Sequence, residues 1–203
     1  MMAPPERSAE RDAAIEAMLP HVPFDGWTLK SLKMGLADAG MPADEADLLF
    51  PLGTADMVAT FCDLADRRME AAASELTATR VSARLRAVIA LRLDQNRPHK
   101  EAIRRAIGVL SLPPHGRTAL GCTARTVDAI WYAAGDRSAD FSWYTKRAIL
   151  TAVYSSTLLF WLRDQSKDNE DTLAFLDRRL AAVGKMGGLR RRADALLGRL
   201  KPA

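Results

Sequence analysis

Apolar residues recur at helical spacing along almost the whole chain, and this pattern predicts its secondary structure. Leu, Ile, Val, Met and Ala stand three, four and seven residues apart, whereas alternation of β-branched and polar residues is almost absent. Proline, glycine and capping residues bound the periodic segments. The expected helices cover 8–18, 29–39, 43–50, 54–76, 80–96, 98–110, 115–134, 143–161, 172–183 and 189–200. The chain is therefore predicted to be all-α.

The segments between these helices suggest three parts. Residues 1–53 hold three short helices with a glycine turn before the third, which are the proportions of a helix-turn-helix. Thr28 is the expected cap of the second helix, and 19–26 is expected to be a turn-rich link. Residues 54–183, beginning with Thr54 as a cap, form a larger helical bundle. The glycines within 184–188 predict a hinge, so that 184–203 is a separate amphipathic helix.

The most informative stretch is 127–161, which contains three of the four tryptophans and all three tyrosines. A break at 134–140 separates two helices, and 148–162 carries no charge. On the second helix Trp143, Leu150, Thr157 and Trp161 fall on one line, with Tyr154 beside it. A helix that is apolar on most sides is usually buried in a helical protein. It is either a core helix only or a core helix that also lines an apolar cavity, and it is too short to span a membrane.

The helix-turn-helix proportions raise the hypothesis of a transcriptional regulator. The expected reading helix, PADEADLLFP, carries Asp44, Glu45 and Asp47 and no Lys or Arg. Acidic groups at this position would repel the DNA backbone, whose neutralisation supplies much of the affinity. The motif is therefore predicted to be degenerate. A TetR-type regulator that binds DNA and a hydrophobic effector remains the alternative function.

The basic charge lies at the C-terminus. The chain has 203 residues and a net charge of +4, but residues 185–203 contain six basic residues and one acid, which leaves −1 for the rest. A hinged, cationic amphipathic helix indicates an interfacial membrane anchor. The alternative is a helix docked on its own domain or on a partner subunit. The candidate membrane-binding residues are Leu189, Arg190, Arg191, Ala193, Leu196, Leu197 and Leu200.

Candidate chemistry is scarce, and an enzyme is not expected. The two cysteines are far apart in sequence and outside any C-x-x-C pattern, and the three histidines lack metal-ligand spacing. Phosphate-loop, dinucleotide and nucleophile-elbow motifs are missing, so no cofactor or metal is predicted. Arg84, Arg86 and Arg92 are expected on a solvated helix face. The N-terminus has no secretory or transit signal, which favours a cytoplasmic protein.

Two segments then point to a family. DAIWYAAGDRSADFSWYTKRAILTAVYSST (128–157), followed by EDTLAFLDRRL (170–180), closely resembles the signature of the coenzyme Q (ubiquinone) biosynthesis accessory family, the ninth protein of that pathway. LPHVPFDGWT (19–28) and LFPLG (49–53) are similar to the same family. The resemblance therefore covers nearly the whole chain.

The resemblance implies a lipid-binding protein with a TetR-like fold. Its expected ligands are lipids, including isoprenoid quinone intermediates, and its expected partner is the di-iron hydroxylase that acts on demethoxyubiquinone at the membrane. The candidate lipid-binding residues are Trp131, Leu150, Tyr154, Thr157 and Trp161. The match to the family motif implies a partner patch of Ile130, Asp140, Trp143 and Tyr144.

Three further expectations rest on analogy with the family. TetR-like proteins commonly dimerise through their late helices, so a homodimer is expected. Mitochondrial members would need a leader, and its absence points to a bacterial protein. Such a protein is expected in the cytoplasm, peripherally bound to the inner face of the plasma membrane.

Overall fold

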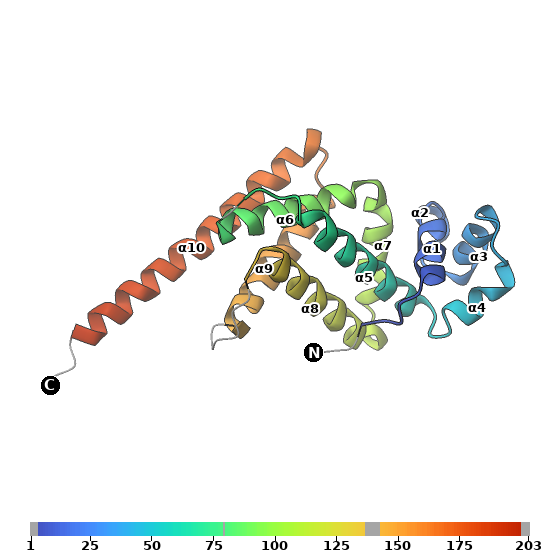
Figure 1. The fold of residues 1–203 in the computed structure, drawn as a ribbon, viewed down its shortest axis with the longest axis horizontal. Coiled ribbons are helices and arrows are strands. Elements are labelled where there is room, and N and C mark those ends of the chain that lie inside the picture. The colour runs from blue at the N-terminus through green and yellow to red at the C-terminus, as the bar shows by residue number, and fades with distance from the viewer. Residues whose placement is uncertain (1–3, 79, 137–142, 200–203) are drawn as a thin grey trace. The chain divides into compact units, whose positions relative to one another are not determined.

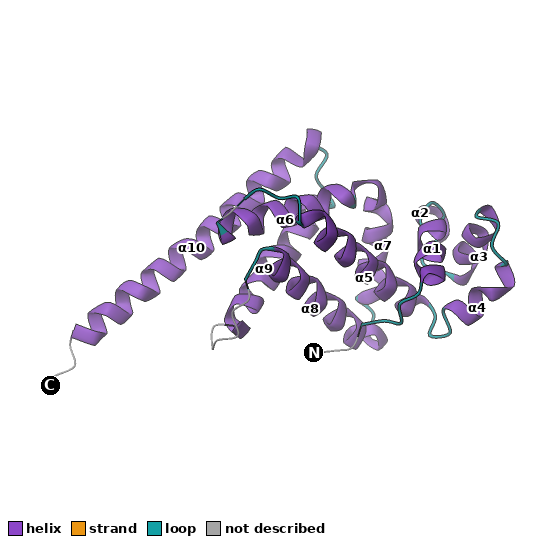
Figure 2. Cartoon of the chain, in the orientation of Figure 1, coloured by secondary structure: helices purple, strands orange, loops and turns teal. Residues whose placement is uncertain are grey.

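The computed structural model describes residues 4–78, 80–136 and 143–199, and every regular element within them is a helix (Figure 1, Figure 2). For residue 143 and for 185–199 only the backbone is described. The all-α prediction is therefore confirmed. The chain divides into two compact units, residues 1–139 and 140–203. The three functional parts expected from the sequence stay a prediction.

The first unit begins with a group of short helices. They are α1 (Ala9–Met18), α2 (Val22–Asp25), α3 (Leu29–Asp38), the 3-10 turn η1 (Ala43–Glu45) and α4 (Ala46–Leu49). Thr28 caps α3 as predicted, because its hydroxyl accepts a hydrogen bond from the Ser31 backbone at 3.2 Å. α1 and α3 approach so closely that a Cβ at Gly35 would lie 2.5 Å from the Ala17 carbonyl. Only glycine fits there, and the α1–α3 contact depends on it.

The rest of this unit is built around α5 (Thr54–Ala73), which contacts α1, α6, α7 and α8. The chain continues through α6 (Val81–Gln95), η2 (Arg97–His99), α7 (Lys100–Leu110), η3 (Pro113–His115) and α8 (Gly116–Ala133). Met57, Met69, Ile89, Leu93 and Ile130 are among its largest fully buried side chains. Burying such a side chain contributes about 1.5–3 kcal/mol, so these stripes hold the unit together.

The second unit is a helical hairpin. It consists of α9 (Trp143–Trp161), the turn η4 (Lys167–Asn169) and α10 (Glu170–Arg199). The rings of Phe160 and Phe175 stack with their centroids 4.6 Å apart, which joins the end of α9 to the start of α10. Aromatic pairs of this kind contribute about 0.5–1.5 kcal/mol beyond their buried area.

Three local predictions are wrong. The link over 19–26 contains helix α2, because Pro23 stands at a first-turn position where its missing N–H costs nothing. Thr54 does not cap α5: Gly53 holds that position with φ 73°, and no side chain caps the helix. The expected hinge within 184–188 lies inside α10, which is unbroken. Glycine lowers helix stability by about 1 kcal/mol relative to alanine without forbidding the conformation.

None of the described helices has, alone, the length and hydrophobicity of a membrane span, and only the bent pair Ala43–Leu49 with Thr54–Ala73 reaches them together.

Candidate functional site

From Ala148 onward helix α9 is uncharged and mostly apolar, since no residue between 148 and 162 is charged. Three hydroxyl groups, those of Thr151, Ser156 and Thr157, donate to carbonyl oxygens of the same helix. Thr157 Oγ1 donates to the Val153 carbonyl oxygen at 2.7 Å, and Ser156 Oγ donates to the same oxygen at 3.0 Å. A hydroxyl bonded to its own helix leaves no unpaired polar group for a neighbour. This surface can therefore contact an apolar molecule without the penalty of an unsatisfied donor.

Four of the five residues predicted to bind lipid lie on α9 and are buried. Leu150, Tyr154, Thr157 and Trp161 follow one line, and the most exposed of them, Tyr154, retains 7% exposure. The fifth, Trp131, lies on α8 in the other compact unit. A core helix and a cavity-lining helix both require such burial, so the lipid-binding role stays a prediction.

Trp131 has one unusual atom. Its indole N–H is buried and has no hydrogen-bond acceptor among the described residues. By contrast, the Trp27 indole donates to the Ala102 carbonyl at 2.9 Å, and the Trp161 indole donates to Asn169 Oδ1 at 3.1 Å. A buried donor without an acceptor costs about 1–3 kcal/mol. Trp131 is therefore the candidate donor to an oxygen atom of a bound molecule.

A rigid turn joins α9 to α10. Asp164 accepts hydrogen bonds from the backbone N–H groups of Ser166 at 2.7 Å and Thr172 at 2.9 Å, and from the Thr172 hydroxyl. Burial alone would raise the pKa of Asp164, but these hydrogen bonds outweigh it and lower the pKa to about 2. Asp168 and Asn169 adopt φ values of 52° and 60°, in the left-handed region that Asp and Asn tolerate better than most residues. The turn therefore fixes how the two helices meet.

The predicted partner patch is described only in part. The side chain of Tyr144 is 77% exposed in the first turn of α9, whereas Ile130 has no exposed surface. For Trp143 only the backbone is described, and Asp140 lies outside the described residues. Tyr144 is accessible to a partner.

The predicted membrane-binding residues are likewise known only by their backbone. They occupy the last turns of α10, and Leu200 lies outside the described residues. Because α10 is continuous, these residues extend the helix that begins at Glu170 and do not form a hinged segment. The membrane-binding role stays a prediction.

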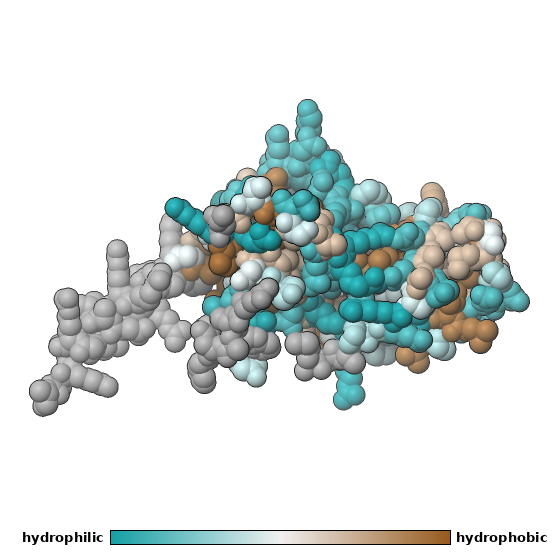
Figure 3. Space-filling model, viewed as in Figure 1, coloured by the Kyte–Doolittle hydropathy of each residue, from teal (hydrophilic) through white to brown (hydrophobic). Residues whose placement is uncertain are grey.

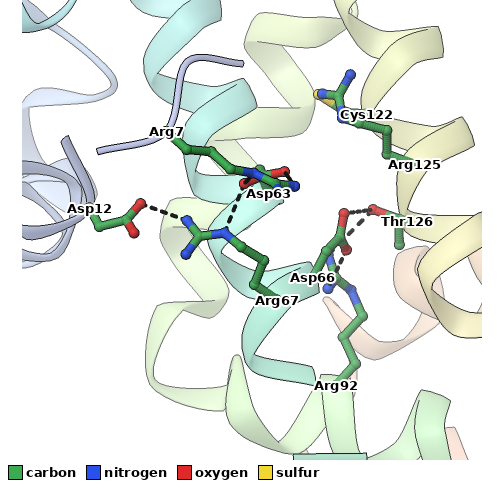
Figure 4. Close-up of polar contacts among 9 residues, drawn as sticks. All are labelled: Arg7, Asp12, Asp63, Asp66, Arg67, Arg92, Cys122, Arg125 and Thr126. Atoms are coloured by element: carbon green, nitrogen blue, oxygen red, sulfur yellow. Dashed lines mark hydrogen bonds and ion pairs between the residues drawn. The ribbon is translucent and has the colours of Figure 1, made fainter. Parts of the chain in front are cut away.

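A polar cluster around the buried Asp63 ties α5 to the N-terminal segment, and no sequence pattern indicated it (Figure 4). Asp63 accepts hydrogen bonds from Arg7 at 2.7 and 2.9 Å and from Arg67 at 2.9 Å. Arg67 also donates to Asp12 of α1 at 2.7 Å. Burial alone would raise the pKa of Asp63, but its two arginine partners lower it overall. Arg7 and Asp12 are more than fifty residues from their partners on α5, so these two contacts depend on the tertiary fold.

One turn further along α5, Asp66 forms a buried ion pair with Arg92 of α6 at 2.6 Å (Figure 4). Thr126 of α8 donates to the same carboxylate at 3.1 Å. Burial raises the pKa of Asp66, and Arg92 opposes that effect. The expectation that Arg92 is solvated is wrong, because its charge is matched inside the bundle. In the sequence, Arg92 falls within the apolar stripe that contains the buried Ile89 and Leu93. A charged residue within such a stripe could have indicated that Arg92 is buried.

Arg84 is also turned inward, contrary to the expectation of a solvated face. Its guanidinium donates to the carbonyl oxygens of Ala73, Leu76 and Ala133 at 2.8–2.9 Å. These groups lie at or just beyond the C-terminal ends of α5 and α8, where carbonyls lack partners within their helices. Arg84 thus caps two helices at once.

The COQ9 family model matches residues 116–187, which span α8, α9 and the first half of α10. The ubiquinone biosynthesis protein coq9 of Schizosaccharomyces pombe is 32% identical over 184 residues, covering 90% of this chain and 73% of that protein. The chain belongs to the COQ9 family. The COQ9 proteins of Xenopus tropicalis and Homo sapiens are 36% and 31% identical, and each match covers 85% of this chain. The match spans 57% of the length of each of these two relatives.

A solved structure shows the fold of this COQ9 family member. The crystal structure of a TetR transcriptional regulator from Nitrosomonas europaea ATCC 19718 matches with a TM-score of 0.68 and 24% identity. The match covers 86% of this chain and 98% of that chain. At this identity the likeness establishes the fold alone. The predicted TetR-like all-α fold and the predicted family are both confirmed.

Proposed function

We propose that this COQ9 family member is a lipid-binding accessory protein of ubiquinone biosynthesis and not itself an enzyme. It holds an isoprenoid quinone intermediate or another lipid against α9 and presents it to the demethoxyubiquinone hydroxylase at a membrane. Family membership supports the pathway. The observation that carries lipid binding is the uncharged length of α9, in which the hydroxyls of Thr151, Ser156 and Thr157 are bonded to the helix's own backbone.

Long isoprenoid chains need such a surface. Each CH₂ group moved out of water contributes about 0.8 kcal/mol, so even a few isoprene units bind strongly in an apolar site. A quinone also carries carbonyl oxygens, and the buried N–H of Trp131 lacks an acceptor among the described residues. The Trp131 N–H is therefore the donor that we propose for a carbonyl oxygen of the quinone.

The membrane part of the proposal depends on the charge of the C-terminal segment. Six basic residues against one acid within 185–203 favour an anionic surface, where each Lys or Arg contributes about 1 kcal/mol. We place this surface at the inner face of a bacterial plasma membrane. The hydroxylase would contact the exposed Tyr144 together with Trp143 and Asp140, and the protein would act as a homodimer.

DNA binding is the second candidate, because the matched solved structure is a TetR transcriptional regulator. The charges of the N-terminal helices oppose it. Asp44, Glu45 and Asp47 are exposed where a regulator needs cations, and Lys33 is paired with Asp47 at 3.2 Å. We therefore propose no nucleic-acid partner.

The test is to extract the protein, purified without detergent, with organic solvent and to identify the released lipids by mass spectrometry. We expect an isoprenoid quinone or phospholipid at close to one molecule per chain. A protein that releases no lipid, and takes up none from vesicles containing ubiquinone, would contradict the proposal. Its apolar helix would then be core only.

A further inference from the structure

The TetR-like fold gives the short helix α4 a special position. In helix-turn-helix proteins the second helix of the motif lies in the major groove of DNA, and its N-terminal residues contact the bases. Here the turn after α3 leads into η1 and α4, where Asp44, Glu45 and Asp47 are exposed. A segment placed to contact a macromolecule thus carries charges that exclude nucleic acid.

Two leucines project from the same segment. Leu48 in α4 and Leu52 in the following loop are each 81% exposed, while Phe50 between them is 2% exposed. Figure 3 shows hydrophobic atoms gathered over α4 and this loop. An exposed apolar patch that is rimmed by polar residues is typical of a protein interaction site. Together Asp44, Glu45, Asp47, Leu48 and Leu52 form what we call the head surface.

The head surface is held rigid from below by Arg11 of α1, which is 4% exposed. Its guanidinium lies 4.3 Å from the centre of the Phe50 ring and donates to the Leu49 carbonyl, to Asp56 at 2.8 Å and to Thr60 at 3.0 Å. These contacts fix the backbone that carries both leucines. A surface that is already ordered loses little conformational entropy when a partner binds.

We propose that the head surface docks a basic, leucine-rich amphipathic helix of a protein partner. The two exposed leucines would pack on the apolar face of that helix, and Asp44 and Glu45 would pair with its Lys or Arg residues. Beside Leu52 lies a hollow of about 300 Å³, walled partly by Ala55 and Ala59, that can accept one apolar side chain of the partner. This site does not depend on the proposed lipid site.

The charges select this occupant over two others. Phosphates of nucleic acid and of anionic lipid would both meet exposed carboxylates on the α4 side. Lys33 is bound to Asp47, and the hollow beside Leu52 is lined by Asp56, Arg117 and Arg125 as well as by apolar residues. The cations of the docked helix therefore face α4, and its apolar residues face Leu48, Leu52 and the hollow.

The probe is a fluorescent synthetic 18-residue helix made of Leu and Lys, with leucines at helical spacing, titrated against the full chain. A scrambled peptide of the same composition and a version with Glu in place of Lys are the peptide controls. The variants are Leu48→Ser with Leu52→Ser, and Asp44→Lys with Glu45→Lys. Phe24→Ser is the matched control, because Phe24 is 82% exposed on α2, outside the head surface.

We expect both double variants to weaken binding at least tenfold and Phe24→Ser to leave it unchanged. All four changed side chains are exposed, so the thermal transition should stay in place. Equal binding of the scrambled peptide, or unchanged binding by the leucine variant, would overturn the proposal. So would a leucine variant that loses binding to anionic vesicles or self-association, which would assign the surface to a membrane or a second copy. Lipid extraction from the leucine variant should match the wild type, which separates this test from that of the proposed function.

Discussion

The buried ion pair between Asp66 and Arg92 permits a quantitative prediction, because the chain contains a matched exposed pair. Asp94 and Arg97 also meet at 2.6 Å, but their side chains are 62% and 45% exposed, against 8% and 7% for Asp66 and Arg92. The distance between charges is therefore the same, and the largest difference between the pairs is burial. Removing one partner of a buried pair leaves an uncompensated charge and costs about 3–5 kcal/mol. Removing one partner of an exposed pair costs about 0–1 kcal/mol.

We expect Asp66→Asn to lower the free energy of unfolding by about 3–5 kcal/mol. For a chain of this size that corresponds to a fall in Tm of about 6–20 °C. Asp94→Asn should shift Tm by less than about 4 °C. Replacing both buried partners, with Asp66→Val and Arg92→Met, should restore much of the loss, because no charge is then left buried.

Thermal and urea denaturation followed by circular dichroism at 222 nm, with the four proteins side by side, measures these differences. Equal losses for Asp66→Asn and Asp94→Asn would refute the reasoning, since burial would then have no effect on the strength of the pair. A double variant less stable than Asp66→Asn would also refute it. In that case the pair would contribute through packing and not through charge.

Further predictions concern the proposed site and the helical hairpin, with Trp27→Phe as a control. Asp164→Asn should cost about 1 kcal/mol at neutral pH, after allowance for solvent screening of this carboxylate. Because the folded pKa is lowered to about 2, the contribution is present above pH 4 and lost as the pH falls towards 2, so urea titrations of variant and wild type should converge there. Trp131→Phe removes a donor that has no partner among the described residues, so it should lower the amount of extracted lipid without the loss of stability that follows a broken hydrogen bond. Trp27→Phe breaks the hydrogen bond to the Ala102 carbonyl, so it should lower the free energy of unfolding by about 1–3 kcal/mol and leave the amount of extracted lipid unchanged. Deletion of 187–203 should weaken sedimentation with anionic vesicles without emptying the lipid site, and unchanged sedimentation would make that segment a packing element. Trp143→Lys should abolish co-purification with the hydroxylase at unchanged helicity, and retained association would remove that patch from the proposal.

Much of the fold could be predicted because it follows from local rules. Thr28 precedes a periodic segment and caps it, and Gly40 ends the same helix region with φ 69°. The apolar stripe of α5 is buried along its length, as its spacing requires. The family motif lies in α8, α9 and α10, so the position of the candidate site along the chain was also predictable.

The remaining features depend on partners that local patterns do not contain. Gly184 suggests a hinge in isolation, yet a continuous helix accommodates it at a small energetic cost. Arginine is usually solvated, and the burial of Arg92 is explained only by its ion pair with Asp66. Arg11 falls in a helix of mixed polarity, and its contacts with Phe50 and Asp56 depend on two segments about forty residues away.

Ion pairs between the N-terminal helices and α5 also bear on how a partner protein could detect whether the proposed lipid site is occupied. In a ligand-responsive regulator the DNA-contacting part must take two positions relative to the ligand-binding part. Here Arg67 binds Asp12, Arg11 binds Asp56, and Arg68 binds Glu16, so α1 is fastened to α5 at three points along one side. A tilt of α1 against α5 would have to break them together. These ion pairs thus hold α1 and α5 in one arrangement. Under the proposed function, a partner protein would have to sense a bound lipid by contacting the lipid itself.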